Sequence, residues 1–173
     1  MPILDLVFPG GQQGSPKAEQ QFLQRLKAIL SPGVCPILVT DAGFRAPWFR
    51  AVAALGWGWL GRLRHRTFVK PADVPDAPEE WLPGKALYAL ARTTPRDLGL
   101  MDTVQRRPWA CRVIVHGKPA QGRKHRTRQG QLVRSSRSRK NAAREREPWL
   151  LVASPELVDL SAQQLVTLYT RRM

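Results

Sequence analysis

The first 64 residues alternate between short apolar runs and longer segments in which apolar positions recur every three or four residues. Ile3–Phe8 and Pro36–Thr40 are apolar without alternation, which is typical of strands buried on both faces. Trp57–Arg64 places its large apolar residues at every second position and predicts a third strand. Between them, Lys17–Leu30 and Pro47–Leu55 have helical periodicity. The order β-α-β-α-β predicts a layered α/β fold.

The pattern weakens after residue 70. Pro71–Pro83 is acidic and rich in proline, which indicates an exposed loop. Ala86–Ala91 and Ala110–His116 are short strand candidates, and Trp149–Ala153 predicts a last strand. A final helix is expected from Ser161, because a Gln three residues later completes a capping box.

Basic residues dominate the remaining segment, Lys118–Arg146. It contains 11 of the 28 Lys and Arg residues, few acids and almost no apolar side chains. Such a segment cannot bury a core of its own, so we expect it to be mobile in isolation. The whole chain carries a formal net charge of +15, and 21 of its basic residues are Arg. This balance predicts a polyanionic partner, either nucleic acid or an anionic membrane surface.

Length and composition narrow the class of protein. The 173 residues suffice for one globular domain, and no apolar run approaches the roughly 20 residues that cross a bilayer. Cys35 and Cys111 lie far apart and match no metal-ligand spacing, so we expect both to be reduced packing residues. The sequence therefore predicts a soluble, cytoplasmic protein that does not span a membrane. Of the two polyanionic partners we expect nucleic acid, and no membrane.

Asp41 is the strongest candidate for chemistry. It follows the predicted strand Pro36–Thr40 and precedes a glycine, at the edge where open α/β sheets form ligand crevices. A carboxylate there suits a hard cation such as Mg²⁺. The competing interpretation is a turn or helix-capping aspartate, and local chemistry alone favours it.

Trp57 and Trp59 are interpreted as core residues rather than stacking platforms.

Two parts of the chain carry a family resemblance. Pro36–Arg45, followed by Pro47–Phe49 and Leu55–Trp57, resembles DDE insertion-sequence transposases, in particular the insertion-sequence-four type. In that family a strand ends in the second acid of the catalytic triad, followed by Gly-Phe-Arg or a near equivalent. Pro148–Val152 and Leu168–Arg172 resemble the approach to the family's Tyr-x2-Arg-x3-Glu signature.

The resemblance implies a ribonuclease-H-like mixed sheet with flanking helices and a β-rich basic insertion. It also implies phosphoryl transfer on DNA at insertion-sequence ends, with three carboxylates holding two Mg²⁺ ions. Asp41 would be the one catalytic acid and metal ligand present. Tyr169 and Arg172 would act near the cleaved strand. The signature Glu would fall three residues after Met173, and the first acid belongs to an earlier strand, so Asp5 is not favoured. We therefore expect an incomplete fold, truncated at both ends and inactive.

These expectations divide the chain into three parts. Residues 1–70 would form the central catalytic domain, 71–147 the insertion with a proline-rich loop and an arginine-rich segment, and 148–173 the last strand and the start of the final helix. An exposed sheet edge would favour self-association. The expected DNA-binding residues, besides Tyr169 and Arg172, are Arg45, Arg123, Lys124, Arg126, Arg128, Arg134, Arg137, Arg139 and Lys140. DNA binding would associate the protein with the bacterial nucleoid.

Two alternatives to a transposase stay open. One is a non-enzymatic basic nucleic-acid-binding protein of ribosomal-protein type, and the other is an unfolded relic of a broken reading frame.

Overall fold

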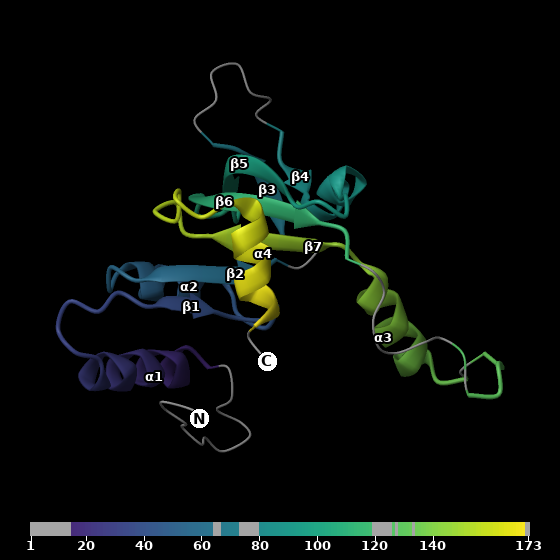
Figure 1. Cartoon of the computed structure of the whole chain (residues 1–173), viewed down its shortest axis with the longest axis horizontal. Helices are drawn as coiled ribbons and strands as arrows, with labels where there is room; N and C mark the ends of the chain where they lie inside the picture. Colours follow the sequence, from purple (N-terminus) through teal and green to yellow (C-terminus); the bar gives the residue numbers. More distant parts are fainter. Residues whose placement is uncertain are drawn as a thin grey trace.

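A mixed sheet with helices on both faces organises the chain (Figure 1). The structure is a computed structural model that describes residues 15–63, 67–72, 80–118, 126, 128–132 and 134–171. Within these residues the sheet has seven strands, and only β1 and β2 pair in parallel. In spatial order the strands are β1 (Ile37–Val39), β2 (Gly58–Arg62), β7 (Trp149–Ala153), β6 (Trp109–His116), β5 (Arg96–Thr103), β3 (Phe68–Pro71) and β4 (Leu82–Pro83). The predicted α/β class with a mixed sheet is confirmed.

The strands expected from apolar runs are present with small shifts at their ends. β7 has the predicted bounds, and β6 begins one residue earlier than predicted. β1 and β2 are each shorter than the runs that predicted them. The expected strand Ile3–Phe8 lies outside the described residues, so it stays a prediction. Strands from all three expected parts of the chain share this one sheet.

Two helices cover one face of the sheet and a third covers the other. α1 (Pro16–Ile29) and α2 (Ala46–Ala53) contribute Leu23, Leu26 and Phe49 to a core cluster with Trp59 and Val113. α4 (Ala162–Thr170) packs Leu165 and Tyr169 on the opposite face, against Leu60, Ile114 and Leu151. Successive strand residues thus enter different clusters, as the period of two requires. Trp57 and Trp59 are both buried, as expected.

Local capping explains where two of these helices start. The Ser15 side chain accepts a hydrogen bond from the amide of Ala18 at 3.2 Å, and Pro16 opens the first turn of α1. Ser161 and Gln164 form the predicted capping box, in which each side chain accepts from the other's backbone amide. Both helix starts were therefore readable from sequence.

The region between residues 68 and 103 differs from the prediction. The expected strand Ala86–Ala91 is wrong, because Gly84–Leu90 forms a 3-10 helix (η2) in which Leu87 is buried and Leu90 is exposed. β3, β4 and β5 were not expected, and β4 lies within the predicted loop Pro71–Pro83. In β5 the register shifts between Asp97 and Leu100, where Gly99 has φ 77°, so the apolar alternation that marks a strand is interrupted.

The basic segment contains more regular structure than expected. Ser136–Arg146 forms a helix, α3, which extends away from the sheet in Figure 1. The Ser135 hydroxyl accepts from the amide of Ser138 at 3.4 Å, and Ala142 is buried. The expectation that this segment is mobile in isolation is not tested by these contacts and stays a prediction. Cys35 is also exposed rather than packed, whereas Cys111 is buried as expected.

Candidate functional site

Asp41 lies just beyond the carboxyl end of β1. The amide of Thr40 donates to the carbonyl of Leu60 at 2.9 Å, which carries the β1–β2 pairing up to this point. The Asp41 side chain is exposed, and its Oδ1 accepts a hydrogen bond from the amide of Gly43 at 2.6 Å. The strand therefore presents the carboxylate at the predicted edge, while the hydrogen bond is that of a turn aspartate.

Gly43 lets the carboxylate approach the backbone closely. A Cβ atom built on Gly43 would lie 2.8 Å from Oδ1 of Asp41, closer than side chains approach one another. The Asp-Ala-Gly sequence thus encodes a tight turn that fixes one carboxylate oxygen. The loop that follows leads directly into α2 at Ala46.

A pocket of about 510 Å³ opens beside this loop. Its walls come from residues 42–47, from Phe49 in α2, from the end of β2 with Arg62, and from the β5–β6 turn with Val104 and Trp109. Three aromatic side chains and two guanidinium groups line it, and none of the described lining residues is acidic. Sequence reasoning did not find this pocket, because its walls are far apart in the chain.

Arg45 is exposed on the wall of the pocket. It is the residue immediately before α2, and its side chain does not cap the helix. Burial raises the pKa of Glu19 in α1, and the positive charge of Arg45 acts in the opposite direction. Arg45 therefore lies close enough to α1 to interact with that carboxyl group, while remaining accessible to a ligand.

The aromatic wall of the pocket is held by ring contacts. Trp109 lies 4.7 Å from Trp59 and 6.3 Å from Phe49 between ring centroids. The Arg50 guanidinium lies 5.7 Å from the centroid of Trp109 and donates to the carbonyl of Arg107. These contacts connect α2 to the β5–β6 turn. Cys111 behind them is buried, and this burial raises its pKa to about 12, so its thiol stays neutral.

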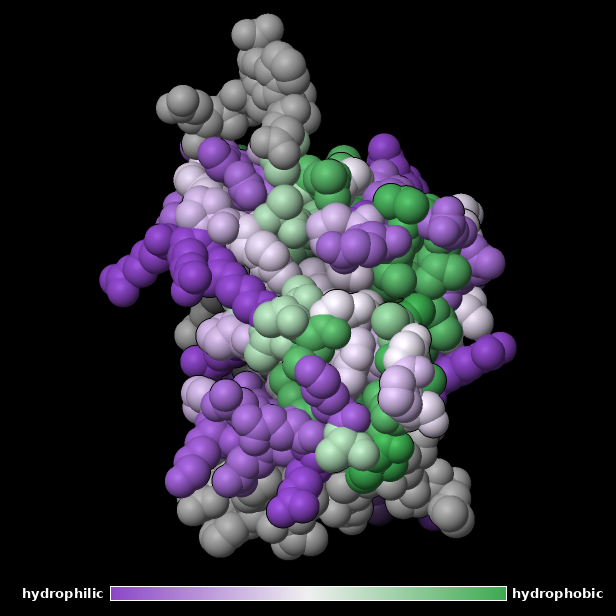
Figure 2. Space-filling model, turned by 90° about the vertical axis from the view of Figure 1, so that its left-hand side faces the viewer, coloured by the Kyte–Doolittle hydropathy of each residue, from purple (hydrophilic) through white to green (hydrophobic). Residues whose placement is uncertain are grey.

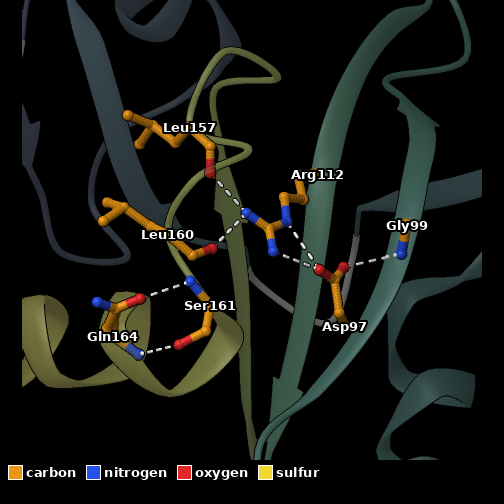
Figure 3. Close-up of polar contacts among 7 residues, drawn as sticks. All are labelled: Asp97, Gly99, Arg112, Leu157, Leu160, Ser161 and Gln164. Atoms are coloured by element: carbon orange, nitrogen blue, oxygen red, sulfur yellow. Dashed lines mark hydrogen bonds and ion pairs between the residues drawn. The ribbon is translucent and has the colours of Figure 1, made fainter.

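Arg112 connects β6 to the start of α4 (Figure 3). Its Nε donates to Oδ2 of Asp97 at 2.8 Å, and one terminal nitrogen lies 2.6 Å from the same oxygen. The other terminal nitrogen donates to the carbonyls of Leu157 and Leu160, both at 2.6 Å. In the sequence, Arg112 is a charged residue inside an otherwise apolar strand. That pattern indicates a buried polar contact, but Arg112 was not among the predicted functional residues.

Tyr169 is buried near the carboxyl end of α4. Its ring meets Trp149 edge to face at 4.9 Å between centroids, and β1 residues Ile37 and Val39 pack against the same cluster. The helix thus ends on the β1 side of the sheet, the side that bears Asp41. The expected DNA contact of Tyr169 stays a prediction, and its ring is only 1% exposed here. Arg172 lies outside the described residues.

The described members of the predicted cationic set are all exposed. Arg126 donates to the carbonyl of Gly130 at 2.9 Å across a turn, next to an isolated bridge between Arg126 and Leu132. Arg123 and Lys124 lie outside the described residues. The exposed members are Arg126, Arg128, Arg134, Arg137, Arg139 and Lys140. The last three belong to α3, so the segment is partly organised as a basic helix.

The carboxylates needed for a two-metal site are not brought together in the described part of the chain. No group of three or more His, Cys, Asp or Glu residues there is placed to hold a metal ion. Asp41 can supply one oxygen ligand, which does not suffice for two ions held by three carboxylates. The described residues thus do not fit a complete centre. None of the described helices is long and apolar enough to span a membrane.

Comparison with known families decides the class of protein. The family model of the transposase DDE domain matches residues 2–173. The chain belongs to the transposase DDE domain family. This membership supports a transposase function, a DNA partner and the use of a divalent metal, and it does not favour the ribosomal-protein alternative. No curated protein and no solved structure matches the chain.

Proposed function

We propose that this transposase DDE domain is of the insertion-sequence-four type and binds insertion-sequence ends. The observation that carries the proposal is the family match over residues 2–173. Asp41 after β1, within a Gly-Phe-Arg context, supports the assignment to that type. Such binding would associate the protein with the nucleoid.

Asp41 is proposed as the catalytic acid and Mg²⁺ ligand that these residues contribute. Its exposed position at a strand end allows an oxygen to face solvent and a bound phosphate. Since the three-carboxylate arrangement is not assembled in the described residues, we propose that the 173-residue chain alone does not catalyse strand transfer.

The basic segment is proposed as the main DNA-binding element. α3 extends from the sheet and carries Arg137, Arg139 and Lys140 as exposed side chains (Figure 1). Because these cations project away from the core, they can contact phosphates without desolvating other groups. They contact the backbone of DNA rather than base edges, so this binding does not depend on sequence.

Salt titration tests this assignment. Each neutralised phosphate contributes about −0.9 to the slope of log affinity against log salt, so about five contacts give a slope near −5. Changing Arg134, Arg137, Arg139 and Lys140 together to Gln should flatten the slope of duplex binding by up to about four units. Equal slopes, or a strong preference for one duplex sequence, would contradict the assignment.

A matched control removes the same charge elsewhere. Lys17, Arg25, Lys27 and Lys85 are exposed on α1 and η2, away from the basic segment in sequence. Changing these four to Gln lowers the net charge equally, and it should leave the slope close to that of the unchanged chain. A similar flattening in both variants would mean that net charge, not the basic segment, governs binding.

Cleavage assays test the catalytic part of the proposal. The purified chain, supplied with Mg²⁺ or Mn²⁺, should neither nick nor join DNA. Asp41→Asn should leave duplex affinity unchanged or slightly higher, since it removes one negative charge. Metal-dependent cleavage that Asp41→Asn abolishes would show that Asp41 has further acidic partners within the chain.

A further inference from the structure

The guanidinium of Arg112 spans two elements that are far apart in the chain (Figure 3). Nε and one terminal nitrogen contact Oδ2 of Asp97 at 2.8 and 2.6 Å, and the other terminal nitrogen donates to the carbonyls of Leu157 and Leu160. The side chain is only 13% exposed, so water competes little with these bonds. β6 therefore holds the loop that leads into α4 through charge-assisted hydrogen bonds, which are directional.

A bulge in β5 turns Asp97 towards this guanidinium. Asp97 opposes Ile114 of β6, whereas Leu100 opposes Arg112, so one extra residue lies on the β5 side. That residue keeps Asp97 and Leu100 on the face of the sheet on which α4 packs, because successive strand residues alternate between faces. Oδ1 of Asp97 also accepts a hydrogen bond from the amide of Gly99 at 2.9 Å, and Gly99 has φ 77°. The carboxylate is thus oriented by its own strand, independently of the guanidinium.

Apolar side chains hold the body of α4 on the sheet. Leu165 and Tyr169 pack into the cluster beneath the helix. Contacts of this kind are non-directional, so they stabilise the helix on the sheet without fixing where along its axis it lies. The capping box at the start of α4 joins residues of one segment and does not bind the sheet. Among these contacts, the bonds from Arg112 are therefore the ones that set the axial position of α4.

The far end of α4 depends on that position. The ring of Tyr169 meets Trp149 edge to face at 4.9 Å, and this end of the helix lies on the β1 side of the sheet, which bears Asp41. A slip of the helix by one residue would move the ring by about 1.5 Å along the axis and turn it by about 100°. In enzymes, a misplacement of about 1 Å can lower the rate about 100-fold. The anchor at the start of α4 therefore controls the geometry at its end.

We propose that Arg112 is a positioning residue, which fixes where α4 lies on the sheet and thereby places Tyr169 relative to Asp41. This inference rests on the proposed function, in which Asp41 is the catalytic acid and the end of α4 acts near the cleaved strand. Arg112 acts through the β7–α4 loop rather than on the DNA. An arginine suits this role because its planar fork presents donors to a carboxylate and to backbone carbonyls at the same time.

Fluorine NMR of the full chain reads the position of Tyr169. The chain has two tyrosines, Tyr88 and Tyr169, so labelling with 3-fluorotyrosine gives two resonances, and Tyr88→Phe assigns them. The Tyr169 resonance depends on the ring current of Trp149, whereas Tyr88 packs against the core cluster on the other face of the sheet. Arg112→Met should displace the Tyr169 resonance by more than its linewidth and leave the Tyr88 resonance in place. A merely structural role would lower stability without moving either resonance of the folded chain.

Three further variants make the test specific. Arg112→Lys keeps the charge, but a single nitrogen cannot span Asp97 and both carbonyls, so the Tyr169 resonance should stay displaced. Lys70→Met removes a neighbouring ion pair and is the matched control, which should leave both resonances unchanged. Asp97→Asn protects the test against a folding defect, because Asp97 is exposed, and it should displace the Tyr169 resonance in the same direction but less far. An unmoved Tyr169 resonance in folded Arg112→Met, Arg112→Lys or Asp97→Asn overturns the inference, as does an equal displacement in Lys70→Met.

Binding to a duplex separates this inference from the proposed function, because both resonances are read without DNA. If duplexes bind with the expected salt slope but Arg112→Met leaves the Tyr169 resonance unmoved, the positioning role is wrong and the DNA-binding proposal stands. If Arg112→Met displaces that resonance but duplexes do not bind, the positioning role stands and the DNA-binding proposal fails.

Discussion

Cys111 is a buried thiol on the face of β6 that packs under α2. Its surroundings exclude water, and the desolvation of the thiolate raises its pKa from 9.0 to about 12. The unfolded chain loses this proton near pH 9 and the folded chain keeps it. The free energy of unfolding therefore keeps its full value below pH 9, and it falls as the pH rises from 9 towards 12.

Alkaline unfolding measures this effect. The unchanged chain should lose free energy of unfolding relative to Cys111→Ala as the pH rises above 9, by up to about 1.4 kcal/mol per pH unit. Urea unfolding of both proteins between pH 8 and 11 gives the difference. Other groups that ionise in this range are common to both chains and cancel. A difference that does not change with pH would contradict a buried, protonated thiol.

At the scale of elements, α4 is attached to the sheet through Arg112. Its guanidinium is 13% exposed and bonds to Asp97 and to two backbone carbonyls of the β7–α4 loop (Figure 3). Arg112→Met should lower the free energy of unfolding by about 2 kcal/mol, since it leaves these acceptors unpaired. Chemical denaturation measures the loss.

A neighbouring ion pair provides the control. Lys70 and Asp102 lie 3.9 Å apart on β3 and β5, with side chains 31% and 22% exposed. Lys70→Met should cost less than about 1 kcal/mol, because a longer and more exposed pair contributes little. Similar losses in the two variants would show that the carbonyl contacts of Arg112 contribute nothing.

The elements also show which features sequence reasoning captured. Helix α4 and strand β7 were predictable because Ser161 and a continuous apolar run act locally. β5 was missed because its bulge at Gly99 breaks the alternation, and η2 was misassigned because short apolar runs fit several structures. Asp41 was found from its place after a strand. The pocket was not, since Arg62, Val104 and the Asp41 loop meet only through the tertiary fold.

At the scale of the molecule, β1 lies at one end of the described strand order. Thr40 directs its amide to β2, so the amide of Val39 points away from β2, on the side where no other described strand pairs with β1. Apolar side chains also reach the surface in the side view of Figure 2, and exposed ones include Phe68, Leu100 and Val158. We therefore propose self-association through the β1 edge.

Sedimentation as a function of concentration tests this proposal. The unchanged chain should associate, and Val39→Pro should reduce the association because it removes the outward amide without touching the β1–β2 hydrogen bonds. Val39→Thr keeps the amide and is the control. Equal association of both variants would place the contact elsewhere, for example on the exposed apolar side chains.

The position of β7 has a consequence for biosynthesis. β7 lies between β2 and β6, and it is the strand through which the two halves of the described sheet are joined. It follows both partners by a long stretch of chain, which includes the basic helix. During translation, β7 is therefore synthesised after β1, β2, β3, β5 and β6, the strands that it joins. The two half-sheets expose unpaired edges during that interval, and exposed strand edges are the feature that makes an incomplete chain prone to aggregation.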